Sequence, residues 1–285
     1  MKNRFLFLLI LFLQMGTLNS PIHAETISDT QLIEHIRSAL SIPLNWNIQI
    51  MDNNPSELQG INRITLQFSM NNQIQKQELY ISSDRKHYII GNIYHSDINL
   101  DAMRMSLIDI KNSPMKGTID APITLVEFTD LQCPSCKKTH SMIEQEKIIE
   151  EYQGKVKFVF KNFPLPNHSW STPAAIACMC AYDQNKNAFW SMSNNIFEQQ
   201  PSITLENLNE KILDAAEKSN LNIKKFKDCY DQKKLLPKIQ QDMKEGDAIG
   251  IRVTPTLMVN GRLFQGPPDA AQLKELINFF LEQKK

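Results

Sequence analysis

The chain contains 285 residues, with 31 basic and 31 acidic side chains, 42% hydrophobic residues and 9 glycines. This length allows one or two domains with a sizeable core. The moderate charge and ample aliphatic content exclude disorder over the whole chain, and so few glycines exclude a collagen-like chain. The balanced charge gives no indication of a nucleic-acid-binding protein.

Residues 1–24 have the pattern of a secretory signal peptide. Lys2 and Arg4 precede an unbroken apolar run at 5–13, and Ala24 ends a small-residue cleavage site. The run is too short for a membrane span, which needs roughly 20 apolar residues. We therefore predict cleavage after Ala24 and export of the remaining chain to the periplasm, an oxidising compartment that allows disulfides. An uncleaved anchor or a buried N-terminal helix is the alternative.

Residues 25–111 are predicted to form a small α+β domain. Ser28 to Gln31 is a capping-box pattern, and the apolar positions that follow share one helix face: Leu32, Ile33, Ile36 and Leu40. Alternating residues then predict strands over 64–70, 79–81 and 88–94. The segment has no cysteine and no clustered acidic residues, so we expect no catalytic chemistry in it. The sequence Asn112-Ser113-Pro114 marks its C-terminal boundary.

Residues 112–285 are predicted to form a second domain of the α/β class. A strand of the buried type at 123–128 is followed by a helix that runs from the CPSC motif to about Tyr152. Another strand follows at 156–160. This β-α-β order predicts two parallel strands with a right-handed crossover.

A long helical region is predicted over about 171–248. Thr256 to Asn260 then predicts a strand, Gly261 turns the chain, and Asp269 is positioned to cap a last helix. The apolar residues of that helix share one face: Leu273, Leu276, Ile277 and Phe280. The domain is therefore expected to end in a short strand pair and a helix.

The strongest chemical signal is Cys133-Pro134-Ser135-Cys136, between a strand and a helix. Pro134 suits the first helical turn, because its missing N–H is not needed there. Cys133 then lies at the helix N-terminus, where free N–H groups and the helix dipole favour a thiolate. Cys136 lies one turn later and can close a disulfide with Cys133. A low-pKa thiolate is a good leaving group, which makes the disulfide form an oxidant.

Two other interpretations of this motif are open. A zinc site would need a second pair of ligands. His140 is close in sequence, but Cys178 and Cys180 have the wrong spacing for that second pair. A purely structural disulfide is the other interpretation, although cysteine pairs at helix starts are typically reactive.

Residues 117–285 resemble the DsbA-type thiol:disulfide interchange proteins. The matching segments come in family order: Ala121–Phe128, the CPSC motif, Phe163–Pro166 with His168, Ala174-Ala175, Cys180-Ala181, Phe189-Trp190 and Val253–Thr256. The resemblance implies a thioredoxin-like α/β fold with an inserted helical domain at about 171–248. It also implies a cis peptide bond at Thr254–Pro255 beside the CPSC pair, and a buried Glu127 that moves protons during thiol exchange. The alternatives are a trans Thr254–Pro255 bond and an exposed Glu127.

Two features depart from the best-known members of this family. Pro134-Ser135 replaces the Pro-His of the strong oxidant, so the redox potential does not carry over. Thr254 before the proline resembles the dimeric isomerases of the DsbC type. Residues 25–111 also resemble the small dimerisation domain of those isomerases in element order and position. We therefore expect a homodimer through residues 25–111.

Three cysteines remain in the helical region, Cys178, Cys180 and Cys229. Cys178 and Cys180 are two residues apart on a helix, so they point to different sides and should not pair with each other. The family resemblance implies a structural disulfide between Cys180 and Cys229, with Cys178 free and buried. A Cys178–Cys229 bond and three reduced cysteines are the alternatives.

Together these features predict a periplasmic thiol:disulfide oxidoreductase that needs no cofactor and no metal. Its catalytic residues would be Cys133 and Cys136, with Glu127, Thr254 and Pro255. The expected partners are unfolded or partly folded exported proteins and a membrane protein that recycles the redox pair, and no nucleic acid is expected. Whether the protein oxidises or isomerises disulfides stays open. The alternative function is a redox-inactive chaperone or metallochaperone that uses the same surface.

Overall fold

The computed structural model describes residues 27–71 and 73–283. The chain divides into two compact units, one up to His95 and one from Ser96 onward. The predicted signal peptide, residues 1–24, lies outside the described residues. In the part of the chain that the structure describes, no helix is long and apolar enough to cross a membrane.

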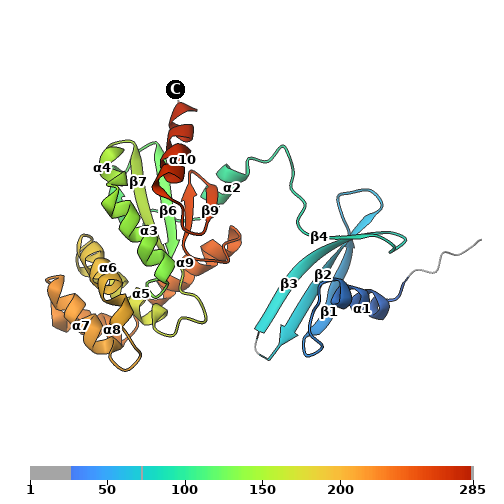
Figure 1. Ribbon diagram of the computed structural model, residues 1–285, viewed down its shortest axis with the longest axis horizontal. Helices are drawn as coiled ribbons and strands as arrows, with labels where there is room; N and C mark the ends of the chain where they lie inside the picture. Colours follow the sequence, from blue (N-terminus) through green and yellow to red (C-terminus); the bar gives the residue numbers. More distant parts are fainter. Residues whose placement is uncertain (1–26, 72, 284–285) are drawn as a thin grey trace, which may run out of the picture. The chain divides into compact units, whose positions relative to one another are not determined.

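The N-terminal unit is one helix packed on a four-stranded antiparallel sheet with the strand order β1-β2-β3-β4 (Figure 1). Its elements are α1 (Asp29–Ala39), β1 (Asn47–Pro55), β2 (Ile61–Met70), β3 (Gln73–Ser82) and β4 (Tyr88–Ile90). The capping box is confirmed, because the Ser28 side chain accepts from the Gln31 N–H and the Gln31 side chain accepts from the Ser28 N–H.

The core of this unit follows the alternation seen in the sequence. Leu32 and Ile36 of α1 are buried against inward-facing residues of the sheet: Ile48, Ile64, Leu66, Phe68, Leu79 and Ile81. Leu40, the last of the residues expected on that helix face, is the C-cap of α1 and is 46% exposed. It also missed β1, where Ile48 is the one buried residue and a bulge between Ile50 and Asp52 breaks the alternation. Strand β4 ends at Ile90, earlier than expected.

The second unit begins before the expected boundary at 111/112, because helix α2 (Leu100–Ser106) is held by a late hairpin. Asp101 forms an ion pair of 2.8 Å with Arg262, and Arg104 donates to the carbonyl oxygen of Gly261. A side chain at position 261 would put its Cβ 1.9 Å from the Asp101 carbonyl oxygen, and the φ angle there is +96°. Glycine is therefore required at this turn on both counts.

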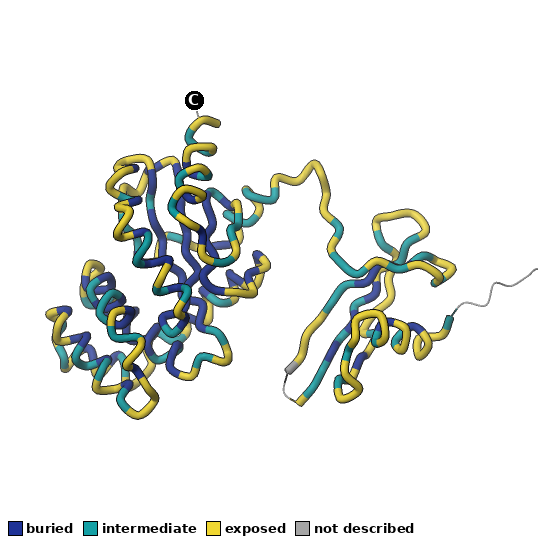
Figure 2. The backbone as a smooth tube through the Cα atoms, in the orientation of Figure 1, coloured by how far each residue is buried: buried dark blue, intermediate teal, exposed yellow. Residues whose placement is uncertain are grey.

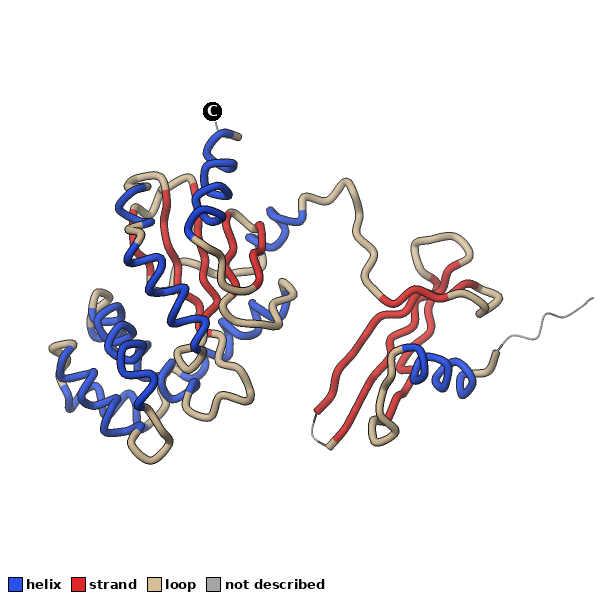
Figure 3. The backbone as a smooth tube through the Cα atoms, viewed as in Figure 1, coloured by secondary structure: helices blue, strands red, loops and turns tan. Residues whose placement is uncertain are grey.

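A five-stranded sheet with the order β5-β7-β6-β8-β9 forms the centre of the second unit (Figure 3). Its strands are β5 (Met115–Gly117), β6 (Ile123–Thr129), β7 (Val156–Asn162), β8 (Thr256–Val259) and β9 (Arg262–Gln265). Strands β6 and β7 are parallel, which confirms the predicted β-α-β unit, and the other neighbours pair antiparallel.

Helices pack around this sheet. They are α3 (Pro134–Gln145), α4 (Ile148–Glu151), α5 (Ser171–Gln184), α6 (Ala188–Gln199), the 3-10 helix η1 (Gln200–Ser202), α7 (Leu208–Lys218), α8 (Ile223–Asp231), α9 (Leu236–Ala248) and α10 (Ala270–Glu282). Helices α5 to α9 occupy the segment expected to be helical. The helix expected up to Tyr152 is instead two helices, because Lys147 adopts a left-handed conformation between them. Asp269 caps α10 as predicted.

Both faces of the sheet are covered, so its central strands β6, β7 and β8 are buried along almost their whole length (Figure 2). On one face of the sheet, Ile123 and Leu125 of β6 pack with residues of α3, α4, α5, α6 and α10. Val126 and Phe128 pack on the opposite face with Ile249 and with Ile108. A strand buried on both faces needs a continuous apolar run, as the sequence of β6 has.

A network of buried charged side chains connects β7 to α9. The Lys161 ammonium is fully buried and lies 3.0 Å from Asp242 Oδ1 and 2.7 Å from Glu245 Oε2, both on α9. It also donates to the carbonyl oxygen of Asp109, whose N–H donates to Glu245. Burial alone would lower the pKa of Lys161, but the two carboxylates outweigh burial and raise it. The network joins α9 to β7 and to the segment before β5.

The inserted helices contain one disulfide. Cys180 of α5 and Cys229 of α8 are bonded, with a Cα–Cα distance of 5.9 Å and a separation of 49 residues along the chain. Cys178 is free and fully buried. This is the pairing that the family resemblance implied. The bond joins the first helix of the insert to a later one.

We expect peptide mapping of the non-reduced protein to recover a Cys180–Cys229 link. A double Cys180→Ala, Cys229→Ala variant should lose up to about 4 kcal/mol of unfolding free energy, because a loop of this length is then no longer closed in the unfolded chain. Denaturant titration measures this loss. Cys178→Ala is the matched control, since it keeps the bond. A Cys178–Cys229 peptide, or an alkylated Cys229 in the oxidised denatured protein, would contradict the pairing.

Candidate active site

The CPSC motif lies where β6 ends and α3 begins. Cys133 is the N-cap residue of α3, Pro134 is its first residue, and Cys136 lies on its first turn. The expected position of Pro134 is therefore confirmed. The carboxyl ends of the parallel strands β6 and β7 meet at one edge of a sheet, so the loop from β7 to α5 lies at the same edge (Figure 1).

The two thiols differ in exposure and in acidity. The exposed fraction is 7% for Cys133 and 0% for Cys136. A hydrogen bond from the Cys136 thiol, helped by the backbone N–H groups of Cys136 and Ser135 at the helix start, lowers the pKa of Cys133 to about 5, although burial opposes this. Burial and the neighbouring Cys133 raise the pKa of Cys136. Cys133 is therefore the thiolate at neutral pH, and Cys136 keeps its proton.

The peptide bond between Thr254 and Pro255 is cis and lies beside this pair. The carbonyl oxygen of Thr254 is 3.5 Å from the Sγ of Cys133, although 121 residues separate the two in sequence. The antiparallel pairing of β8 with β6 brings them together, since Thr256 is opposite Phe128. Val253, just before this bond, is 45% exposed. A cis X-Pro bond is uncommon in folded proteins.

Glu127 is fully buried on β6, as expected. It lies between Phe160 of β7 and Leu257 of β8 in the strand register. Neither carboxyl oxygen has a hydrogen-bond partner among the residues described. Burial, and to a smaller extent the charge of Cys133, raise the pKa of Glu127 to about 8, although the nearby Thr129 hydroxyl opposes this rise. The side chain can therefore give up or take up a proton near neutral pH.

Sequence analysis did not single out Asp130, which connects the motif to the loop after β7. The Asp130 side chain is fully buried, and its oxygens accept hydrogen bonds from four groups: the Gln132 N–H, the Leu165 N–H, the His168 Nδ1 and the Ser171 hydroxyl. Of these residues, Leu165 and His168 lie at positions that match the family, but no role beside the redox pair was expected for them. The available signal was an acidic residue between a buried strand and a redox motif.

Among the described residues, the CPSC motif has no further ligands that would complete a zinc site. Within residues 27–71 and 73–283, no group of three or more histidine, cysteine or acidic residues could hold a metal ion. His140 is buried, with its Nε2 at 2.6 Å from the Asn194 side-chain oxygen and its ring stacked on Phe197. Cys180 is bonded to Cys229.

Comparison with known proteins agrees with this site. The family model described as Thioredoxin matches residues 109–278. Disulfide bond formation protein D of Bacillus subtilis is 32% identical over 179 residues, which cover 61% of this chain and 80% of that protein.

Solved structures give the same result. Oxidised BdbD from Bacillus subtilis has a TM-score of 0.56 at 30% identity and covers 61% of this chain and 95% of its own. The catalytic domain of Proteus mirabilis ScsC has a TM-score of 0.53 at 26% identity and covers 64% of this chain and 97% of its own. With a redox pair at the start of α3 and these relatives, the chain belongs to the thioredoxin family, as a thiol:disulfide oxidoreductase of the DsbA type.

Proposed function

We propose that this oxidoreductase forms or isomerises disulfides in exported proteins through the Cys133–Cys136 pair. The single observation that carries the proposal is the difference between the two thiols, one acidic and partly accessible, the other buried and protonated. The partners would be unfolded or partly folded exported proteins, together with a membrane protein that recycles the pair. The predicted signal peptide supports a periplasmic location.

In the oxidising direction, a substrate thiolate attacks the Sγ of Cys133 in the Cys133–Cys136 disulfide. The S–S bond breaks, Cys136 leaves as a thiolate, and a mixed disulfide joins Cys133 to the substrate. A second substrate thiolate then attacks the mixed disulfide and forms the substrate disulfide. Cys133 leaves as a stable thiolate, because its pKa is about 5. The enzyme gains two electrons in this cycle, and the recycling partner must remove them.

Glu127 and the cis-proline turn are proposed to support these steps. A carboxyl group with a pKa of about 8 can pass a proton to the departing Cys136 thiolate and accept it again. The Thr254 carbonyl oxygen, 3.5 Å from Cys133, lies where an extended substrate segment would run past the reactive sulfur. The exposed Val253 adds an apolar surface for that segment.

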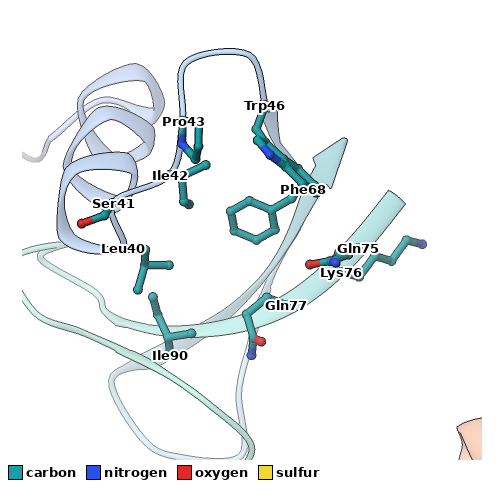
Figure 4. A pocket seen from close by; sticks show the side chains of 10 residues that line it. All are labelled: Leu40, Ser41, Ile42, Pro43, Trp46, Phe68, Gln75, Lys76, Gln77 and Ile90. Carbon is teal, nitrogen blue, oxygen red and sulfur yellow. The ribbon is translucent and has the colours of Figure 1, made fainter. Parts of the chain in front are cut away.

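The N-terminal unit is proposed to form a homodimer. Its sheet and α1 enclose a groove of about 510 Å³, in which Leu40, Ile42, Phe68 and Ile90 point toward a common hollow (Figure 4). The unit also exposes large apolar side chains, of which Leu44 is 87% exposed. Apolar surface of this kind is typical of association sites. A dimer with two redox pairs would favour isomerisation, and a monomer would favour simple oxidation.

Trapping tests the roles of the cysteines. A Cys136→Ala variant should accumulate a mixed disulfide with reduced or scrambled substrate proteins, because the resolving thiol is missing and Cys133 stays linked. Cys133→Ala should trap nothing. Non-reducing electrophoresis and mass spectrometry measure both. The reverse pattern would exchange the two roles, and no adduct with either variant would favour the redox-inactive chaperone.

Alkylation measures the acidity of Cys133. In the reduced protein, the rate of reaction with iodoacetamide should rise with pH through a midpoint of about 5, rather than the ordinary thiol value of about 8.5. Below that midpoint Cys133 is protonated and slow, and above it the thiolate reacts. Cys136→Ala should move the midpoint upward, because it removes the leading cause of the shift. A midpoint near the ordinary thiol value in the wild-type protein would refute the proposed thiolate.

Light scattering tests the dimer. At tens of micromolar, the chain without residues 1–24 should have twice the monomer mass. Leu40→Glu places a charge in the groove and should shift the protein to monomer. Ile119→Glu, at a position 65% exposed in the second unit, is the matched control and should leave the mass unchanged. A monomeric wild-type protein would rule out this assembly.

A further inference from the structure

The Asp130 carboxylate ties together two chain segments that are far apart in sequence. Oδ1 accepts from the Gln132 N–H at 2.7 Å and from the Ser171 hydroxyl. Oδ2 lies 2.8 Å from the Leu165 nitrogen and 2.7 Å from the His168 Nδ1. Gln132 belongs to the turn before α3, and the other three residues belong to the loop after β7 and the start of α5. A fully buried carboxylate with this many donors is held in one place.

The backbone of Asp130 contacts both cysteines. Its N–H lies 3.4 Å from the Sγ of Cys136, and its carbonyl oxygen accepts from the Cys133 N–H at 3.0 Å. Among the hydrogen bonds of the described residues, this N–H is the backbone donor to the buried thiol. An N–H aimed at a sulfur stabilises the charged form of that sulfur. The carboxylate and this donor belong to the same residue, so the contacts that hold the carboxylate also restrain the N–H.

The side chains of Gln132 and Gln200 also form hydrogen bonds that hold the turn before α3. The Gln132 side chain accepts from the Trp170 N–H at 2.8 Å. The Gln200 side chain donates to the carbonyl oxygens of Leu131 and Cys133 at 2.8 and 3.1 Å. Their side chains hold the turn near the inserted helices, but neither side chain contacts the Cys136 sulfur in the hydrogen bonds described. The Asp130 cluster, which consists of Asp130, Gln132, Leu165, His168 and Ser171, reaches that sulfur through the Asp130 N–H.

We infer that Asp130 is a positioning residue for the step in which Cys136 attacks or leaves. Its carboxylate, fixed by the loop after β7, holds the Asp130 N–H against the Cys136 sulfur, where it stabilises the developing thiolate. The inference rests on the proposed roles of Cys133 and Cys136. Neither the carboxylate nor His168 touches the reacting sulfurs in this arrangement; they act through the backbone of the turn.

The step can be followed with 5,5′-dithiobis(2-nitrobenzoate). The Cys133 thiolate attacks the aryl disulfide, which forms a Cys133–thionitrobenzoate mixed disulfide and releases one thionitrobenzoate. Cys136 then gives its proton to a base, the role proposed for Glu127, and attacks the Cys133 sulfur. The Cys133–Cys136 disulfide forms, the aryl mixed disulfide breaks, and a second thionitrobenzoate leaves. The first release therefore reports on Cys133, and the second reports on Cys136.

Asp130→Asn is the main variant. An amide cannot accept at both of its ends, so the contact with the Leu165 N–H or the Gln132 N–H is lost. We expect the second release to slow roughly tenfold relative to the first, as for the loss of a hydrogen bond to a charged group. The Cys133 adduct should then be detectable by mass. His168→Ala and Ser171→Ala each remove one donor and should slow the second release less, which keeps the test usable if Asp130→Asn folds poorly.

Asp242→Asn is the matched control. Asp242 is also fully buried and hydrogen-bonded, but its partners are Lys161, Asn162 and Lys238 rather than the turn. This variant should lower the unfolding midpoint without changing the ratio of the two releases. An unchanged ratio in Asp130→Asn, or an equal change in Asp242→Asn, would overturn the inference. A wild-type protein that releases no thionitrobenzoate from Cys133 would instead refute the proposed function.

Discussion

The contact between Cys133 and Cys136 at the first turn of α3 is the interaction on which the chemistry depends. The buried thiol donates to the accessible one, and the free N–H groups of the helix start add to that stabilisation. The contact depends on two features of the fold. Strand β6 ends at Thr129, just before the motif, and Cys136 is buried in the core. The same burial keeps the second thiol protonated. One local geometry therefore makes two identical side chains chemically different.

The ionisable side chains buried on the two faces of the sheet, Lys161 and Glu127, have opposite environments. On one face Lys161 is paired with Asp242 and Glu245, and a group paired so fully is held in its charged form. On the other face Glu127 has no hydrogen-bond partner among the described residues, and its pKa is raised to about 8. A buried carboxyl without partners costs stability. The proton transfer proposed for Glu127 would give that cost a chemical use, whereas the paired network joins α9 to β7.

The N-terminal unit differs from the second unit in its cysteine content and in its family match. It contains no cysteine, and the match to the thioredoxin model begins only at residue 109. Its features are an apolar core beneath α1 and an apolar groove between α1 and the sheet. Both features fit the association role proposed for this unit. The alternation of apolar and polar residues was enough to predict its sheet, except where a bulge in β1 hides the pattern.

The sequence by itself determined the features whose causes are local. The apolar run of β6, the proline after Cys133 and the caps at Ser28 and Asp269 depend on neighbours within a few residues, and each was predictable. The family resemblance added the cis bond before Pro255. Only the tertiary structure decided the distant partners of Asp130, which lie 35 to 41 residues away, and the two carboxylate partners of Lys161, which lie 81 and 84 residues away. Such contacts depend on which loops meet at a sheet edge and which helix covers a face, and no local pattern records that.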